Sequence, residues 1–165
     1  MYSNTASPSL PGAPMSEAES NARAKLATII GLEEIVRTCN STLGTDMPWG
    51  AEAQELINDN DWSDLGPSDL GHEAAWFARQ SVALGIDYTA RWSAGTDFDG
   101  KPDRFQIWLS FGGPSCWIEG GFDRYGQAMW CDIELHGSWA STPERYNLGD
   151  DECQALAWFS SLVTA

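Results

Sequence analysis

Apolar residues recur at helical spacing in the first half of the chain and at alternate positions in much of the second half. Spacings of three and four residues are typical of a helix that buries one face. They predict three helices, over residues 22–39, 51–58 and 72–84. Gly31 lies inside the first of these, where glycine costs about 1 kcal/mol relative to alanine. The apolar face of that helix is formed by Leu26, Ile29, Ile30, Leu32 and Val36.

From residue 86 the apolar period shortens to two, which predicts β-strands. The segments between them are short and contain Gly with Pro or Asp, as turns require. Short connections between successive strands indicate an antiparallel meander. A loop is expected over residues 137–149, and the acids at 150–152 then open a last helix to about Val163, because acids favour a helix N-terminus. The four strands are expected over residues 86–92, 104–110, 115–121 and 127–135.

Together these elements predict an α+β fold. It is a four-stranded antiparallel β-meander with N-terminal helices and a C-terminal helix packed on one face. Residues 1–20 are rich in Ser, Pro, Ala and Gly, so we expect a flexible tail. Residues 21–165 are expected to form a single domain, mainly helical over residues 21–85 and with its sheet over residues 86–136.

Alternation along the predicted strands assigns their side chains to two faces of the sheet, provided that no β-bulge interrupts them. One face is apolar and is expected to form the core under the helices. It contains Phe105, Ile107, Leu109, Cys116, Ile118, Met129, Cys131, Ile133 and Leu135. The positions assigned to the other face include no base, and Gln106 and Ser110 are among them. Its remaining members, called here the tryptophan face, are Trp108, Trp117, Glu119, Trp130, Asp132 and Glu134.

Two interpretations of the tryptophan face stay open. Its tryptophans can cover the sheet or pack under a loop, in which case they serve folding. Alternatively, the tryptophans anchor a partner protein while the acids select a basic one.

The chain carries a formal net charge of −15, from 24 acidic and 9 basic residues. Charged residues make up 20% of the chain, below the usual ~25%, so missing cations contribute more than added anions. This balance argues against direct binding to nucleic acid or to an anionic membrane, and it would attract a basic partner. The cysteines are widely spaced and the N-terminus does not resemble a secretory signal, so we expect a cytoplasmic protein with reduced thiols.

The segment from Thr38 to Ala78 contains no Lys or Arg. Its acids can simply keep the protein soluble. Alternatively, they occupy a basic groove in which nucleic acid would otherwise bind, because an acidic helix and loop roughly imitate the spacing of phosphates. The residues expected to contact a partner, called here the acidic surface, are Glu52, Glu55, Asp59, Asp61, Asp64 and Asp69.

The sequence contains no recognisable motif for catalysis or for phosphate binding. A calcium loop starting at Asp59 would need Gly and Glu where the chain has Asp64 and Leu70. A Cys–His pair formed in space stays open as an alternative. We therefore expect a protein that is not an enzyme, with no catalytic residue, no metal ligand and no cofactor.

The string WLSFGGPSCWIEGGFDRYGQAMW, from Trp108 to Trp130, resembles a theme of small uncharacterised proteins of bacterial phages and plasmids. The theme is a strand, a Gly-Gly-Pro turn, an Ile-x-Gly strand, an Asp-x-Tyr-Gly turn and a helical C-terminus. The resemblance covers roughly residues 86–163, and the N-terminal half does not match it. It implies an origin in a mobile element and no catalytic residue set. By analogy with acidic accessory proteins of such elements, it implies an anti-CRISPR or antirestriction inhibitor.

The expected function is therefore inhibition of a nucleic-acid-targeting defence complex in the cytosol of a bacterial host. The protein would bind a basic surface of a CRISPR or restriction complex, sterically or as a DNA mimic. Two alternatives remain. One is a structural or adaptor protein of the mobile element, which could form a homodimer by pairing the tryptophan faces of two copies. The other is a small enzyme that uses Cys and His.

Overall fold

The computed structural model describes residues 15–41, 48–89, 102–140 and 142–165. They form four α-helices, a π-helical turn and a five-stranded antiparallel sheet. The α+β class is confirmed, and the sheet has one strand more than the four predicted. Most of the predicted tail (1–14) and the end of the first predicted strand (90–92) lie outside the described residues. Within the described part of the chain, no helix has the length and hydropathy needed to cross a membrane.

The first helix, α1 (Glu17–Cys39), begins at Glu17 rather than at residue 22. Ser16 caps it, because its hydroxyl accepts a hydrogen bond from the backbone N–H of Glu19 at 3.1 Å. Ala18 is only 1% exposed, so the last residues of the predicted tail 1–20 belong to the folded core. This part of the prediction was wrong because the first turns of α1 bury alanines, which give a weak apolar signal.

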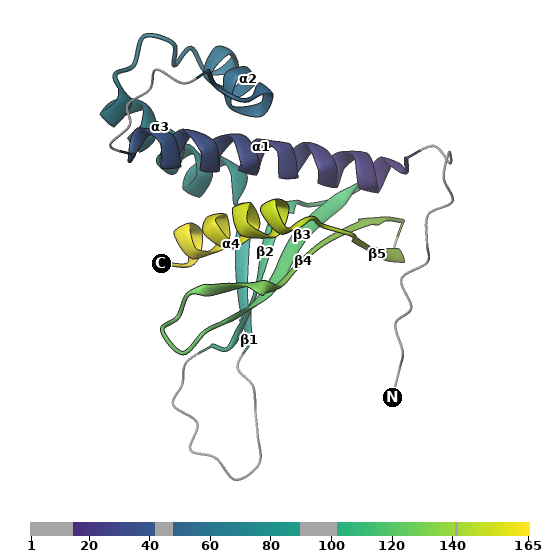
Figure 1. Cartoon of the computed structure of the whole chain (residues 1–165). Coiled ribbons are helices and arrows are strands. Elements are labelled where there is room, and N and C mark those ends of the chain that lie inside the picture. The colour runs from purple at the N-terminus through teal and green to yellow at the C-terminus, as the bar shows by residue number, and fades with distance from the viewer. Residues whose placement is uncertain (1–14, 42–47, 90–101, 141) are drawn as a thin grey trace.

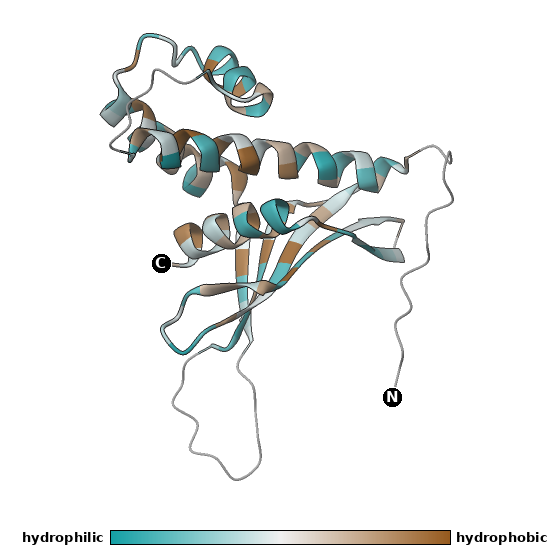
Figure 2. Ribbon diagram, viewed as in Figure 1, coloured by the Kyte–Doolittle hydropathy of each residue, from teal (hydrophilic) through white to brown (hydrophobic). Residues whose placement is uncertain are grey.

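Helix α1 lies between two layers of the molecule (Figure 1). Helices α2 (Ala51–Asp59) and α3 (Pro67–Phe77) contact it on one side, and α4 (Asp150–Thr164) and the sheet contact it on the other. Figure 2 shows hydrophobic residues on α1, on α4 and in the middle of the strands, whereas α2 is largely hydrophilic. The α1 side chains that are fully buried recur at intervals of three or four: Ala22, Leu26, Ile29, Leu32 and Ile35.

Gly31 permits the close approach of α1 and α2. A Cβ atom there would lie 2.7 Å from Leu56 Cδ1 and 2.8 Å from the backbone carbonyl oxygen of Glu52. We expect Gly31→Ala to lower the free energy of unfolding by about 1–3 kcal/mol through overpacking, although helix propensity alone would raise it by about 1 kcal/mol. Urea unfolding measures the change. The control is Ser20→Ala at an exposed position of α1, and a stabilised Gly31→Ala variant would contradict the close contact.

The strands follow one another across the sheet in chain order, which confirms the antiparallel meander. At the turn between β3 and β4, Gly126 has a φ of +81°, which favours glycine. On the inner face Phe105, Ile107 and Leu135 pack with buried residues of α1 and α4 in one core. The strands are β1 (Gly85–Thr89), β2 (Arg104–Ser110), β3 (Ser115–Phe122), β4 (Ala128–Trp139) and β5 (Thr142–Tyr146).

Two elements lie where turns and loops were predicted. Strand β5 falls inside the predicted loop 137–149. Its first four residues are exposed and it contains Pro143, so it shows no apolar alternation and pairs as an edge strand. Helix α3 begins at Pro67 rather than at residue 72, because proline at the first helical position is compatible with a helix start. The π-helical turn Ala78–Val82 continues it.

Register shifts interrupt the sheet at two places, between Trp108 and Ser110 and between Gly120 and Phe122. They change the predicted assignment of side chains to faces. The hydroxyl of Ser110 accepts a hydrogen bond from Asn21 Nδ2 of α1 at 3.0 Å, so Ser110 faces the helices. Cys131, predicted in the core, is exposed.

Candidate functional site

All six residues of the acidic surface are exposed. Glu52, Glu55 and Asp59 lie on α2, Asp61 and Asp64 lie in the turn that follows it, and Asp69 lies in the first turn of α3. Among the residues that the structure describes, no ion pair involves any of the six. Their charge is therefore presented to solvent, as the absence of Lys and Arg from this segment predicted.

Glu52 lies in the first turn of α2, where an acid favours the helix dipole, but the acids of α2 are otherwise electrostatically unfavourable for the helix. Glu52 and Glu55 are three residues apart, and Glu55 and Asp59 are four apart, spacings at which like charges cost about 0.2–0.5 kcal/mol per pair. Asp59 is also the last residue of α2, where a carboxylate opposes the helix dipole and the last turn offers no base. Glu55 and Asp59 therefore do not help α2 to fold, which favours a role in contacting something else.

Backbone hydrogen bonds hold the turn after α2, and they fix the backbone that carries Asp61 and Asp64. The N–H of Trp62 donates to the carbonyl of Ile57 at 2.9 Å. Asp61 has a φ of +56°, a conformation that Asp and Asn adopt more readily than most residues. The ring of Trp62 packs edge-on against Phe77, with centroids 5.7 Å apart. Asp61 and Asp64 therefore project from an ordered turn.

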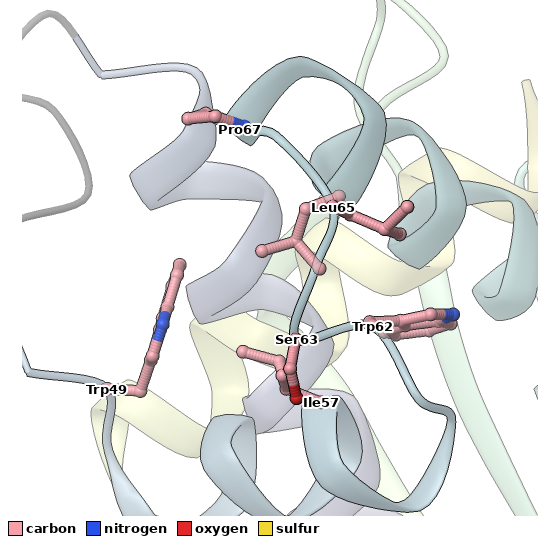
Figure 3. Close-up of a pocket in the computed structure, with 7 residues that line it drawn as sticks. Trp49, Ile57, Trp62, Ser63, Leu65 and Pro67 are labelled. Atoms are coloured by element: carbon pink, nitrogen blue, oxygen red, sulfur yellow. The ribbon is translucent and has the colours of Figure 1, made fainter.

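A pocket of about 160 Å³ opens beside this turn. Trp49, which precedes α2, forms one side, and Ile57 and Leu65 lie across from it, whereas the Trp62 ring points away from Trp49 (Figure 3). Trp62 and Ser63 line the pocket, and in sequence they stand between Asp61 and Asp64. Sequence reasoning missed the pocket because its walls come from separate segments. The only available signal was a pair of tryptophans inside the acidic stretch. The lining residues are Trp49, Ile57, Trp62, Ser63, Leu65, Pro67 and Leu70.

On the tryptophan face, the structure brings Trp108 and Trp117 together with His136. The ring centroids of Trp108 and Trp117 are 5.2 Å apart, and the Trp117 and His136 rings stack at 5.4 Å with an interplanar angle of 7°. Trp117 is only 7% exposed, although the helices lie against the other face of the sheet. The packing favours the interpretation in which Trp117 covers the sheet.

The acids of the tryptophan face have partners, and the expectation that this face lacks bases was wrong. Asp132 accepts a hydrogen bond from Arg104 Nη1 at 3.0 Å. Glu134 Oε1 accepts from Arg145 Nη1 at 2.8 Å, and Glu134 Oε2 lies 2.9 Å from His136 Nε2. Burial acts to raise the pKa of Glu134, but the His136 and Arg145 contacts outweigh it, so that the pKa is lowered. Arg145 was missed because it lies on β5.

Trp130 stands apart from the other two tryptophans of this face. It is 54% exposed and lies within the register shift between β3 and β4, between Ala128 and Ile133. Among the described residues, no aromatic contact joins it to Trp108 or Trp117. The tryptophan face is therefore not one continuous cluster. Pairing of two such faces in a homodimer stays a prediction.

At Cys39, Cys116 and Cys153 the pKa shifts in the direction opposite to that of a reactive thiolate. Burial raises the pKa of Cys116 to about 12, and burial is also the main cause that raises the pKa of Cys39 and Cys153. A catalytic cysteine needs a lowered pKa, so these three positions disfavour the Cys–His alternative. Among the described residues, no hydrogen bond joins a cysteine to a histidine.

We expect iodoacetamide at neutral pH to modify the exposed Cys131 in the folded protein and to leave Cys116 unmodified. Cys116 is fully buried and protonated, so it should react only after denaturation. Peptide mass spectrometry distinguishes the two sites. Equal labelling rates at both cysteines in the folded protein would contradict the burial of Cys116.

The geometry thus defines an acidic α+β protein with a partnered tryptophan face and an exposed acidic surface that forms no ion pair within the described residues. Comparisons with protein-family models, with curated proteins and with solved structures found no match. The proposal of a function therefore rests on the exposed residues of this chain.

Proposed function

We propose that the protein binds a basic, nucleic-acid-binding groove of another protein and blocks the entry of nucleic acid. The acidic surface is the observation that carries this proposal. Its carboxylates are exposed, and within the described residues no cation pairs with them. Glu55 and Asp59 also weaken the helix that presents them, so solubility is not the only role that they fit.

A basic groove that normally holds phosphates would attract this surface over a distance and lose its bound counterions on contact. Exposed carboxylates exert this attraction mainly through faster association, and salt screens it over about 8–10 Å at physiological ionic strength. The net charge of −15 strengthens the attraction, although the shortage of cations is chain-wide. The proposal therefore requires binding that weakens as salt increases.

The pocket beside the Trp49 ring gives this electrostatic contact an anchor. Tryptophan rings bind Lys and Arg side chains through cation–π contacts and through packing of the aliphatic stem. Asp61 and Asp64 adjoin the lining residues Trp62 and Ser63 in sequence, so the pocket would accept a basic side chain of the partner. Insertion of one side chain into this pocket would make the contact selective for a particular partner, which attraction between charges alone does not.

The biological setting follows from the resemblance of Trp108–Trp130 to proteins of phages and plasmids. In that setting the partner is a host defence complex that handles nucleic acid, such as a CRISPR or restriction complex. The protein would then act in the cytoplasm of the bacterial host. The proposed binding to a basic groove does not depend on this biological setting, because the acidic surface requires only a partner with such a groove.

Affinity capture with matched variants tests the proposal. The bait is the full chain, compared with a triple variant, Asp59→Asn, Asp61→Asn and Asp64→Asn, and with a control, Glu17→Gln, Asp150→Asn and Asp151→Asn. Both variants lose three negative charges at exposed positions. The wild type and the control should capture the same basic nucleic-acid-handling protein from a bacterial lysate in equal amounts, and the triple variant should capture less of it. Equal capture by the triple variant would refute the role of the acidic surface.

A further inference from the structure

Three side chains with metal-binding atoms converge on the outer side of β3 and β4. Glu119 pairs with Glu134 across the strands, and His136 lies two residues further along β4, opposite Trp117. One ligand atom of each of Glu119, Glu134 and His136 lies within 4.8 Å of the other two, and all three residues are partly buried. The alternation of β4 places Glu134 and His136 on the same face.

The donor set is two carboxylate oxygens and one imidazole nitrogen. Carboxylate and imidazole ligands suit divalent transition metals. Structural zinc sites usually have four protein ligands, whereas three protein ligands and an open position are typical of catalytic zinc sites. Calcium and magnesium prefer oxygen ligands alone, so the imidazole favours a transition metal.

Neighbouring residues hold each ligand in place. Trp117 Nε1 donates to Glu119 Oε1 at 2.8 Å, and the Trp117 ring stacks on His136. Arg145 Nη1 donates to Glu134 Oε1, which leaves Glu134 Oε2 beside His136 Nε2. Outer contacts of this kind orient the ligands of metal sites. The charges also allow a cation, because two carboxylates against one guanidinium leave a net negative charge.

We propose that Glu119, Glu134 and His136 bind a divalent transition-metal ion of the Zn²⁺ type. The ion would lie between His136 Nε2 and the carboxylates of Glu119 and Glu134, and would join β3 to β4. This site lies on the sheet and is independent of the proposed function of the acidic surface.

Calorimetric titration with Zn²⁺ tests the site, in a Cys131→Ser background that removes the exposed thiol. One saturable Zn²⁺ per chain is expected. Glu119→Gln, which keeps the shape of the side chain, should abolish it, and Trp117→Phe should weaken it about 10–100-fold because an outer contact is lost. His72→Ala, which removes a distant exposed histidine, should leave it unchanged.

A second readout requires no substitution in the site. In NMR spectra of the folded Cys131→Ser protein, the imidazole resonances of His136 should shift on addition of Zn²⁺, with those of His72 unchanged. Absence of saturable binding, or binding that survives Glu119→Gln, would overturn the proposal. So would a Zn²⁺ titration that leaves the His136 resonances unmoved. Circular dichroism of each variant confirms that a lost signal does not come from unfolding.

Discussion

Replacing Trp117 with alanine is expected to lower the free energy of unfolding by about 3–5 kcal/mol. The indole is 7% exposed, lies between the rings of Trp108 and His136, and donates a hydrogen bond to Glu119. Its removal leaves a cavity on the sheet and takes away that donor. Native domains are stable by only about 5–15 kcal/mol, so this one change removes a large part of the total.

Urea unfolding of Trp117→Ala, beside Trp130→Ala, measures this effect. Trp130 is the same residue type in the same sheet but is 54% exposed. Exposed substitutions usually stay within about 0.5 kcal/mol, so the Trp130 variant should unfold nearly as the wild type does. Similar stability of the two variants would show that Trp117 does not carry the packing described above.

This result limits how the tryptophan face can be studied. Because Trp117→Ala is expected to damage the fold, a loss of partner binding in that variant would not locate an interface. Trp130→Ala tests the binding interpretation more cleanly, since its ring is accessible and its removal is tolerated. The partnered acids Asp132 and Glu134 are likewise less available to an outside cation than the acidic surface is.

The triple variant Asp59→Asn, Asp61→Asn and Asp64→Asn is expected to bind the basic partner more weakly. An exposed ion pair contributes about 0.2–1 kcal/mol, so three together contribute about 0.6–3 kcal/mol, or about 3- to 150-fold in affinity. Asparagine also suits the positive φ of Asp61, which a lysine would not. Most of the loss should appear as slower association, and it should shrink as salt is added.

Two controls separate this loss from other causes. The triple variant Glu17→Gln, Asp150→Asn and Asp151→Asn has the same net charge but an intact acidic surface, so its affinity should stay close to that of the wild type. The Asp59, Asp61 and Asp64 variant should also be at least as stable as the wild type, because it removes a like-charge pair and a carboxylate at the C-terminus of α2. An equal loss of affinity in both triples would point to total charge instead of this surface.

Regular periodicity made most of the fold predictable. Strand β2 occupies the predicted residues 104–110, because its buried and less buried positions alternate without interruption until its end. Strand β5 was not predictable in this way, since Pro143 and a nearly fully exposed edge erase the alternation. The faces of Ser110 and Cys131 depended on register shifts, which arise from pairing between strands and leave no local pattern.

The acidic surface was predictable because a segment without Lys or Arg cannot form local ion pairs. Arg104 stands first in the predicted strand 104–110 and alternates with Phe105, so it could have been assigned to the tryptophan face. Arg145 could not, since it comes from β5 and meets Glu134 only through strand pairing. The same holds for Glu119 and His136, which are distant in sequence and adjacent through the β3–β4 register. The pocket beside Trp62 likewise required the packing of separate segments.

Competition with nucleic acid tests the central claim most directly. The captured partner, bound to the immobilised protein, is challenged with increasing concentrations of the nucleic acid that the partner normally binds. Occupation of the basic groove predicts that the nucleic acid displaces the protein and that the two never bind together. A stable complex of all three components would contradict the claim.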